Sequence, residues 1–344
     1  MADLYLGTLG GEDFSTAKAL TEWLCANPLT GDQNIYITSN GADTVPYVWT
    51  ANITLNGYHL NLSVEDSTWN SIKNDPTKWF TWSFGDGCAF FFPINTAGTF
   101  TQQRFKAVAT HKNAGHAFGN AIVSVYSGGG VAIGPYNFKN IIIVGGKNQT
   151  GSSTIKDCIN IGRINTTYVN VENVIVMDSV RDGFATNITT FTPGTYLGRK
   201  YIKNCAALNC ARYGMYIDGH ASFNWTLQNS YSVENLTDWL FYDVDNSTKQ
   251  SLADSDSTLP DIAGMQRGIT IANEVQSTDI TSADFLKLIK GTIEGTSYNP
   301  GSTYLGQTGI DSGLTSDILG RSIPGVDSLY SIGAFQSKSR KALG

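Results

Sequence analysis

Charge is scarce in this chain of 344 residues. Lys, Arg, Asp and Glu make up 15% of it, against about 25% in an average soluble protein. The formal net charge is -6, and basic residues gather only in a short tail that holds Lys338, Arg340 and Lys341. Binding of nucleic acid through its phosphates needs a basic patch, so the composition argues against a nucleic-acid partner.

Long apolar runs are missing as well. The longest, such as residues 141–144, have the length of a strand, whereas a helix that spans a bilayer needs about 20 apolar residues. Residues 1–7 carry neither the basic start nor the apolar run of a secretory signal. We therefore expect no insertion into a membrane, and synthesis in a cytoplasm.

Paired cysteines and metal motifs are absent too. The five cysteines form an odd set without a Cys-x-x-Cys pair, which predicts free thiols and no disulfide framework. Among the four histidines, His111 and His116 are five residues apart, which matches neither a helical zinc motif nor a metal site on one strand face. Residues 128–134 are rich in glycine but miss the dinucleotide spacing, and they predict a turn. The sequence thus implies no metal and no cofactor.

What the chain has instead is Gly, Asn, Ser and Thr, a composition typical of short strands joined by turns. One helix is expected near the start, because Ala17, Leu20 and Leu24 follow one another at helical spacing. Residues 13–16 offer caps, and Pro28 ends the segment. We expect residues 1–33 to form an N-terminal cap or attachment segment with a short capping helix.

From residue 34 the pattern alternates with period two, as it does in strands. An aromatic-rich insertion at 65–100 interrupts this alternation, and its tryptophans Trp69, Trp79 and Trp82 allow two interpretations. In the first, they form a local hydrophobic core beneath a long loop. In the second, they present a surface that stacks on sugars or contacts a partner.

The feature that decides the architecture is an internal repeat. Residues 171–184, 202–215 and 227–240 align without a gap, and their asparagines are 31 and 25 residues apart. Each unit consists of short β-type runs broken at Asn or Gly, so stacked coils are the way for each unit to bury its apolar face. The sequence therefore predicts an all-β fold, a right-handed parallel β-helix (solenoid), over residues 34–245.

The alignment also assigns positions within the stack. Asn173, Asn204 and Asn229 are expected above one another at a corner, with their amides in a hydrogen-bonded ladder. Gly183 and Gly214 are expected to mark a second corner. Two inward stacks are predicted, one of Met177, Leu208 and Val233 and the other of Phe184, Met215 and Leu240.

The carboxylates of the same repeat are the candidates for catalysis. The alignment puts Asp182 and Asp238 in one column, and Asp178 and Glu234 in another. At about 4.8 Å per coil, two coils would separate each pair by roughly 10 Å, near the upper end of the range for an inverting glycosidase. The alternative is that these side chains follow an inward residue at a turn and face water. We favour this alternative, because spacing alone does not reveal a perturbed carboxylate.

After residue 245 the pattern becomes irregular. Clusters of Ser, Asp, Gly and Pro separate short segments such as 268–272 and 284–288. We expect residues 246–344 to form the terminal coil and an irregular C-terminal cap over the open end of the core.

The chain resembles a known group of proteins at both ends. Residues 309–313, 315–324 and 331–336 look like the terminus that closes pectate-lyase-like right-handed β-helix proteins. Together with residues 11–23, they make the chain similar to β-helix proteins encoded by tailed bacteriophages. Ser331 and Gln336 stand where the group has acidic residues, and Ser-Ile-Pro replaces its Arg-Pro. These motifs close the helix and carry no chemistry, so the resemblance concerns the fold first.

This resemblance implies a structural protein of the virion: a capsid decoration, a head spike or a tail-associated fibre subunit. It would be made in the host cytoplasm and lie on the virion surface, as a homotrimer in contact with other virion proteins. Two competing functions stay open, a tail-spike depolymerase that hydrolyses a host surface polysaccharide and an adhesin that binds such a glycan. The repeat offers no convergent catalytic set, so we expect a non-enzymatic protein.

Overall fold

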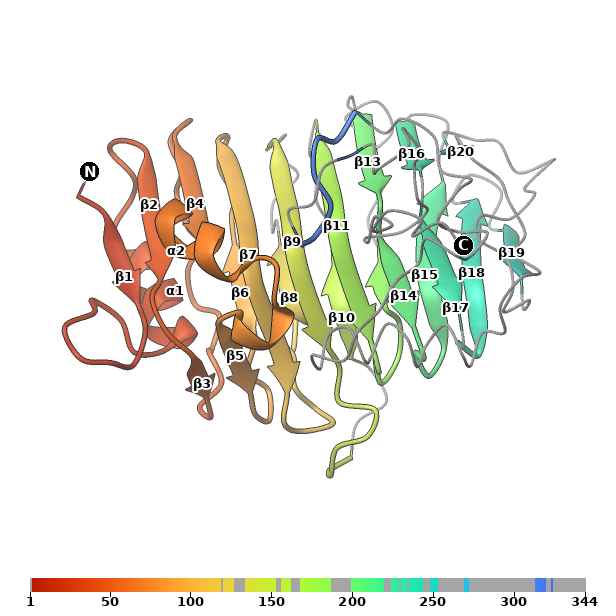
Figure 1. Ribbon diagram of the computed structural model, residues 1–344, viewed down its shortest axis with the longest axis horizontal. Coiled ribbons are helices and arrows are strands. Elements are labelled where there is room, and N and C mark those ends of the chain that lie inside the picture. The colour runs from red at the N-terminus through yellow and green to blue at the C-terminus, as the bar shows by residue number, and fades with distance from the viewer. Residues whose placement is uncertain are drawn as a thin grey trace, which may run out of the picture.

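The computed structural model describes residues 2–118, 120–126, 134–152, 156–161, 168–186, 199–219, 224–228, 230–233, 235–243, 248–252, 269–271, 313–319 and 323. Strands dominate this part of the chain and most of them pair in parallel, which confirms an all-β fold. Figure 1 shows the strands side by side along the long axis, in the order in which the chain visits them.

The larger sheet grows from the N-terminal end. Its path runs through β1 (Leu4–Leu6), β2 (Gln33–Ile37), β4 (His59–Ser63), β7 (Thr99–Ala109), β9 (Tyr136–Val144), β11 (Val169–Met177), β13 (Arg199–Lys203), β16 (Asn224–Gln228) and β20 (Ile269–Ile271). Beside this path lie β3 (Gly41–Asp43), β5 (Thr81–Phe84), β14 (Ala206–Leu208) and β17 (Tyr231–Val233).

A second sheet accompanies the first. It contains β6 (Phe90–Pro93), β8 (Ala121–Tyr126), β10 (Asp157–Asn160), β12 (Phe184–Ala185), β15 (Tyr213–Gly219), β18 (Thr237–Asp243) and β19 (Thr248–Leu252). From β6 to β18 all pairs are parallel, and β19 joins β18 antiparallel. From β7 to β13 the chain alternates between the two sheets, so each circuit adds one strand to each. In the next two circuits the larger sheet receives two strands, β13 with β14 and β16 with β17. The arrangement is β-helix-like.

Four successive circuits bend within the larger sheet at a residue with left-handed backbone. The bend is at Arg104 in β7 and at Asn140, Asn173 and Asn204 in the next three circuits, with φ between 51° and 69°. The Asn173 Nδ2 donates to Asn140 Oδ1 at 3.2 Å, whereas the buried Asn204 amide has no hydrogen-bond partner among the described residues. Asn tolerates this backbone region, which explains its recurrence at the corner. Asn229 lies outside the described residues.

Gly183 and Gly214 are neighbours in adjacent circuits, as the pairing of Phe184 with Met215 requires. Neither has a positive φ. A Cβ on Gly183 would lie 2.6 Å from the Gly214 carbonyl oxygen and 2.8 Å from Val176 Cγ2. Close approach of neighbouring chain segments, and not a left-handed corner, therefore requires glycine here.

The expected N-terminal helix is α1 (Ala17–Ala26). The Thr16 hydroxyl accepts the Ala19 amide at 3.1 Å, and the Asp43 carboxylate accepts the amides of Ala17 and Lys18. Leu20 and Leu24 are fully buried. Two shorter helical segments, α2 (Asp66–Ile72) and η1 (Pro76–Lys78), follow β4.

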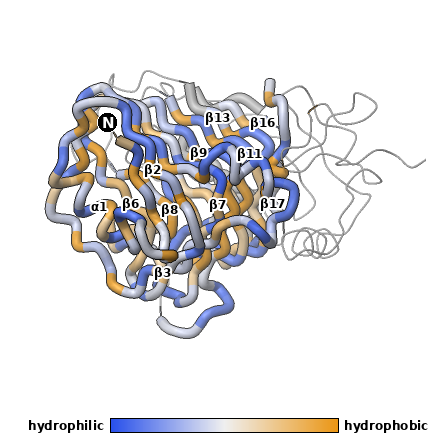
Figure 2. Tube along the Cα trace, turned by 60° about the vertical axis from the view of Figure 1, so that its left-hand side comes forward, coloured by the Kyte–Doolittle hydropathy of each residue, from blue (hydrophilic) through white to orange (hydrophobic). Residues whose placement is uncertain are grey.

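The core lies between the sheets and changes in character along the stack. Its N-terminal half is aromatic, and its later circuits are filled by Val, Ile and Leu; the aromatic members include Phe84, Phe90, Phe92, Phe100 and Phe105. Buried and partly exposed residues alternate along β2 and β5, whereas every residue of β6 is buried. Along the trace in Figure 2, hydrophilic and hydrophobic residues are interspersed. All five cysteines carry free thiols, as the sequence predicts.

One of the two predicted inward stacks is in register and the other is shifted. Met177 pairs with Leu208, and Leu208 with Val233. In the second stack Met215 pairs with Trp239, so the assignment of Leu240 to this stack is wrong. The connection from Val233 to Thr237 is one residue shorter than that from Leu208 to Tyr213, which the gap-free alignment missed. A shift of one residue turns every following side chain to the other face.

Four parts of the predicted terminal region, 246–344, are described: β19, β20, residues 313–319 and Ile323. The strand β20 continues the larger sheet beyond β16. Residues 313–319 lie beside the middle of the stack, where the Ser316 carbonyl accepts the Asn173 amide at 3.0 Å and Ile318 is fully buried (Figure 1). The rest of the predicted C-terminal cap lies outside the described residues. In the part of the chain that is described, no helix has the length and apolarity needed to cross a bilayer.

Candidate functional site

The four candidate carboxylates are not equivalent in the structure. Asp178 ends β11 and is buried, with φ 53°, and Asp182 precedes β12 and is 1% exposed. The pairing of Tyr213 with Thr237 places Asp238 one residue beyond the column of Asp182, so these two do not share a column. Glu234 lies outside the described residues.

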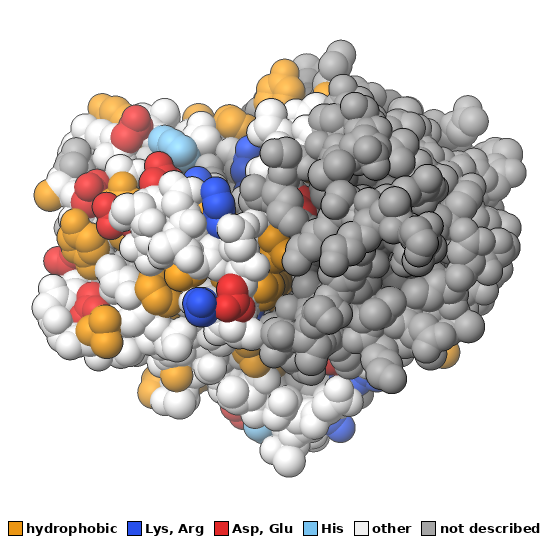
Figure 3. Space-filling view, in the orientation of Figure 1, with side chains coloured by type: hydrophobic (Ala, Val, Ile, Leu, Met, Phe, Trp, Pro, Cys, Tyr) orange, Lys and Arg blue, Asp and Glu red, His pale blue; other side chains and the backbone are white. Residues whose placement is uncertain are grey.

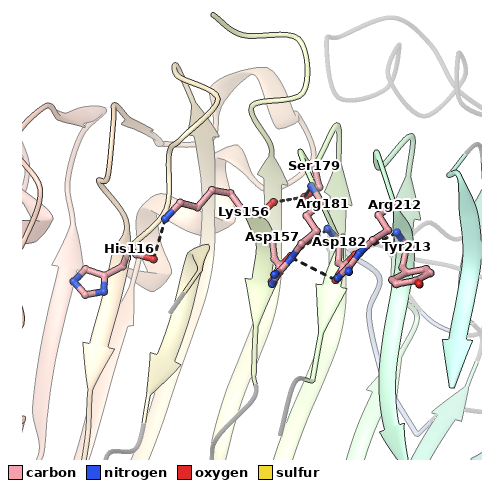
Figure 4. Close-up of polar contacts among 8 residues, drawn as sticks. All are labelled: His116, Lys156, Asp157, Ser179, Arg181, Asp182, Arg212 and Tyr213. Atoms are coloured by element: carbon pink, nitrogen blue, oxygen red, sulfur yellow. Dashed lines mark hydrogen bonds and ion pairs between the residues drawn. The ribbon is translucent and has the colours of Figure 1, made fainter. Parts of the chain in front are cut away.

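Asp182 belongs to a chain of ion pairs between neighbouring circuits, which we call the charge ladder: Asp157, Arg181, Asp182 and Arg212 (Figure 4). Arg181 donates two hydrogen bonds to the Asp157 carboxylate, from Nε at 2.7 Å and from Nη2 at 2.5 Å. One circuit later Arg212 donates two to the Asp182 carboxylate, from Nε at 2.8 Å and from Nη2 at 2.5 Å. Such two-pronged pairing fits the planar guanidinium.

Each carboxylate of the ladder also accepts a backbone amide from the next circuit. Asp157 Oδ1 accepts the Asp182 amide at 3.1 Å, and Asp182 Oδ1 accepts the Tyr213 amide at 3.3 Å. The carboxylate side chains are 0% and 2% exposed. Burial raises the pKa of Asp157, with the Asp182 charge adding to the rise and Arg181 opposing it. Both carboxylates are thus engaged in joining circuits and are shielded from a substrate.

The ladder begins beside a buried lysine. Lys156 precedes Asp157, and its Nζ donates to the carbonyl oxygens of Gly115 and His116 at 2.9 and 3.2 Å (Figure 4). Burial lowers the pKa of this lysine. Its contacts hold the loop before β8 against β10.

His116 links this loop to a group of aromatic side chains. Its ring stacks on Phe91 with centroids 3.7 Å apart, and its Nδ1 accepts the Phe118 amide at 3.2 Å. Nε2 lies 3.0 Å from the Tyr47 carbonyl oxygen and must therefore be the protonated nitrogen. Burial lowers the pKa of His116 to about 4. The neutral ring is a structural element of this region.

Next to His116 the protein exposes what we call the aromatic surface, formed by Val48, Trp49, Phe118 and Tyr126. Trp49 meets the Phe118 and Tyr126 rings edge to face at centroid distances of 5.0 and 4.9 Å. Phe118 is 53% exposed and Val48 70% exposed, while Trp49 and Tyr126 are half-buried. A cluster of partly exposed rings is typical of a contact surface.

The two segments that form the aromatic surface, and the segment of β6 that packs beside them, carry no charge. Residues 44–52, 89–101 and 114–126 contain no Asp, Glu, Lys or Arg, and their polar side chains are Asn, Thr, Ser, Tyr and the buried His116. On the face drawn in Figure 3, the Lys and Arg side chains of the described residues are few and scattered. The aromatic surface therefore offers rings, amides and hydroxyls for contact, and no charged group.

The tryptophans that the sequence offered as a sugar platform do not reach the surface. Trp69, Trp79 and Trp82 are between 1% and 5% exposed. Trp69 and Trp79 pack against each other at 4.7 Å, and Trp82 Nε1 donates to Asp43 at 2.5 Å. They form the local core beneath α2 and β5, so the surface interpretation of these three is wrong.

Sequence reasoning missed the residues that the structure exposes in their place. Trp49 lies in a segment, 47–50, that alternates like a strand, and Phe118 follows three residues after Gly115. The one feature of the sequence that could have pointed to this surface is the absence of charged residues from three separate segments. Nothing in the sequence shows that these segments meet, because residues 49, 118 and 126 are joined only by the packing of β6 and β8.

Cysteine nucleophiles and metal centres find no support in the described residues. Burial raises the pKa of the Cys158, Cys205 and Cys210 thiols. No group of three or more His, Cys, Asp or Glu side chains in this part of the chain is placed to hold a metal ion.

Comparison of the sequence with protein-family models, with curated proteins and with solved structures gives no match. The charge ladder and the aromatic surface therefore have to be interpreted from their own geometry.

Proposed function

We propose that this chain is a right-handed parallel β-helix that serves as a non-enzymatic structural protein of a tailed-bacteriophage virion. The observation that carries the proposal is the use of the polar groups of the repeat. Asp182, which a depolymerase would turn toward its substrate, binds an arginine of the next circuit, and so does Asp157 one circuit earlier. A stack joined in this way suits a rigid shaft.

The place in the virion follows from the resemblance of the terminal motifs, at 309–336, to phage β-helix proteins. In this proposal the chain is a capsid decoration, head spike or tail-associated fibre subunit on the virion surface. Its partners are two further copies of itself and other virion proteins.

The test uses antibodies raised against the purified chain. We expect them to label purified phage particles at regular sites, and we expect light scattering to give three times the chain mass of 37.2 kDa. Recovery of the protein only in the soluble fraction of lysed cells would contradict the virion assignment.

Release of oligosaccharides from host capsular or lipopolysaccharide glycans would instead support the depolymerase function. Full activity of an Asp182→Asn variant would then remove that residue from the mechanism.

A second candidate function, binding of a host surface glycan without cleavage, is favoured by the aromatic surface. Trp49 and Phe118 offer rings for stacking in uncharged surroundings, the combination that suits a neutral sugar. A Trp49→Ala, Phe118→Ala variant should lose glycan binding by at least about tenfold, equivalent to about 1.4 kcal/mol. Tyr168→Ala, at a 48% exposed ring outside this surface, is the matched control. Equal binding by both variants would remove the aromatic surface as the glycan site.

A further inference from the structure

Lys147, Asp178 and Asn209 come from three successive circuits and meet at one edge of the stack. Lys147 follows β9, and its amide donates to the Asp178 carbonyl oxygen at 2.9 Å. Its side chain extends past Asp178 to the next circuit, where Nζ lies 2.8 Å from Asn209 Oδ1 and 2.9 Å from the Asn209 carbonyl oxygen. The lysine is thus held at both ends.

The Asn209 side-chain amide is enclosed between the lysine and the aspartate. Its Nδ2 lies 2.5 Å from Asp178 Oδ1, on the side opposite the oxygen that Lys147 contacts. The orientation of the amide is determined, because an ammonium group only donates hydrogen bonds and an ionised carboxylate only accepts them. The contacts bring an amine within hydrogen-bond distance of the side-chain carbonyl oxygen and a carboxylate next to the nitrogen that would leave. These are the groups that a transamidation uses, once Nζ moves from the carbonyl oxygen to a position above Cγ.

We propose that Lys147 and Asn209 form an intramolecular isopeptide bond with Asp178 as the proton carrier. After the Lys147 ammonium gives one proton to solvent, its Nζ attacks Asn209 Cγ and the Nζ–Cγ bond forms. A hydrogen passes from Nζ to Asp178 and from Asp178 to Nδ2, the Cγ–Nδ2 bond breaks, and ammonia leaves. The products are one secondary amide and one ammonia, with no oxidant or cofactor involved.

The fold supplies the positioning that this reaction requires. Asp178 and Asn209 occupy equivalent left-handed positions, with φ of 53° and 52°, so their side chains project in parallel from neighbouring circuits. Gly145 packs so closely on Asp178 that a Cβ there would lie 2.5 Å from its carbonyl oxygen. Reactants held in contact in this way gain a large effective concentration, and the burial of Asp178 reduces competition from water.

The bond would join the circuit of β9 to that of β14 across the intervening β11. Two circuits that are otherwise held by hydrogen bonds and packing would then separate only if a covalent bond breaks. This inference does not rest on the proposed function, because the reaction needs only the folded chain. It gives Asp178 a role different from the sugar hydrolysis considered for its column.

The decisive measurement is the intact mass of the purified full-length protein. We expect it to fall below the mass of the sequence by one ammonia, and we expect digestion to yield a branched peptide that joins Lys147 to Asn209. Lys147→Arg keeps a donor but no nucleophilic amine, and Asp178→Asn keeps a residue that tolerates the left-handed backbone. Both variants should have their full sequence mass. Lys139→Arg, at a lysine that pairs with Glu172 of the next circuit at 2.8 Å, should still show the loss.

A wild-type mass equal to that of the sequence, without a branched peptide, would overturn the proposal. An ammonia loss that persists in Lys147→Arg would also overturn it, because the loss would then come from another asparagine. A second readout is thermal unfolding: the wild type should unfold at a higher temperature than both variants, and the Lys139→Arg control should unfold close to the wild type.

Discussion

At the scale of single residues, His116 shows how burial fixes a protonation state. Its ring is 2% exposed, stacks on Phe91 and accepts a backbone amide at Nδ1, so protonation would break that hydrogen bond. The surrounding loop therefore depends on a neutral histidine. This dependence makes the stability of the protein sensitive to pH.

The first prediction concerns that sensitivity. The pKa of His116 is lowered to about 4 from 6.5, so between these values the unfolded chain binds more protons and stability falls as the pH falls from 6.5 to 4. The loss should be at most about 3 kcal/mol. Urea unfolding of the wild type and of His116→Gln, at about pH 4 and about pH 7, measures it. The variant should show the smaller loss on acidification.

Comparison of the two proteins also removes the effect of Asp157. Its raised pKa, about 6, acts in the opposite direction, because the folded state then holds the extra proton and stability falls as the pH rises from 3.8 to 6. Since this carboxylate is present in both proteins, the difference between them isolates His116. Identical pH profiles would show that the histidine does not contribute.

The second prediction concerns the left-handed corner at Asn173. Asn173→Gly and Asn173→Ala both lose the side-chain bonds, but only alanine meets a steric penalty at φ 54°. The free energy of unfolding of Asn173→Ala, measured in urea, should be about 1 kcal/mol lower than that of Asn173→Gly. Asn137, another hydrogen-bonded asparagine but one with ordinary strand backbone, is the control. At Asn137 the glycine variant should be less stable than the alanine variant. If alanine were the less stable replacement at both positions, the left-handed backbone of Asn173 would not be the cause.

At the scale of elements, the charge ladder joins strands that the backbone hydrogen bonds join only in part. The strand β12 has only two residues, Phe184 and Ala185, yet it lies between β10 and β15. Asp157 is the first residue of β10 and Asp182 lies two residues before β12, so their arginines bind where these strands begin. We infer that the ion pairs compensate for the shortness of β12.

The third prediction tests this compensation with a double-mutant cycle on Asp182→Asn and Arg212→Met. Asp182 is buried but the Arg212 side chain is 42% exposed, so the coupling should be modest, about 1 to 2 kcal/mol. Free energies of unfolding for the four proteins give the value. A parallel cycle on Lys18 and Glu22, an exposed pair within α1, should give less than about 0.5 kcal/mol. Equal couplings for the two pairs would refute the special role of the ladder.

At the scale of the whole molecule, stability should be shared between neighbouring circuits. Ile143 is fully buried and pairs with Ala107 in β7 and Val176 in β11. No strand pairing links it directly to β1 or β2. A change at Ile143 should therefore be felt most strongly in the adjacent circuits.

The fourth prediction follows from this arrangement. Ile143→Ala should lower the free energy of unfolding by about 2 to 4 kcal/mol, because it leaves a cavity in the core. Native-state hydrogen exchange should accelerate most in β7, β9 and β11, and least in β1 and β2. Uniform acceleration along the whole stack would indicate one fully cooperative unit instead of coupled circuits.

Much of the fold could be predicted from the sequence, since a repeat reports what each circuit buries. The spacing of Met177, Leu208 and Val233 gave the correct register, because equal lengths of chain separate these residues from the Asn corner. The same method failed at Leu240, where one residue fewer in the turn shifted the register. Loop lengths are weakly constrained by the core, so the pattern could not reveal this deletion.

The candidate sites were much less predictable. Asp182 was identified as a polar position of the repeat, but its arginine partner comes from the next circuit and Asp157 lies outside the aligned segment. Trp49 and Phe118 are 69 residues apart and meet only because both flank β6 and β8. Contacts between circuits depend on register and side-chain direction, which neither composition nor spacing specifies.

The sequence by itself determined that this protein is built from short parallel strands with asparagine corners, a free-thiol core and little charge. Period-two alternation and the repeat are local properties, and burial of the apolar face leaves few other ways to satisfy them. Only the tertiary structure decided what the polar residues do. The folded chain pairs Asp157 and Asp182 with arginines and places Lys147 against Asn209. It leaves Trp49 partly exposed and buries Trp82. Whether a side chain faces water or a neighbouring circuit is set by where the chain returns, and that is a property of the whole stack.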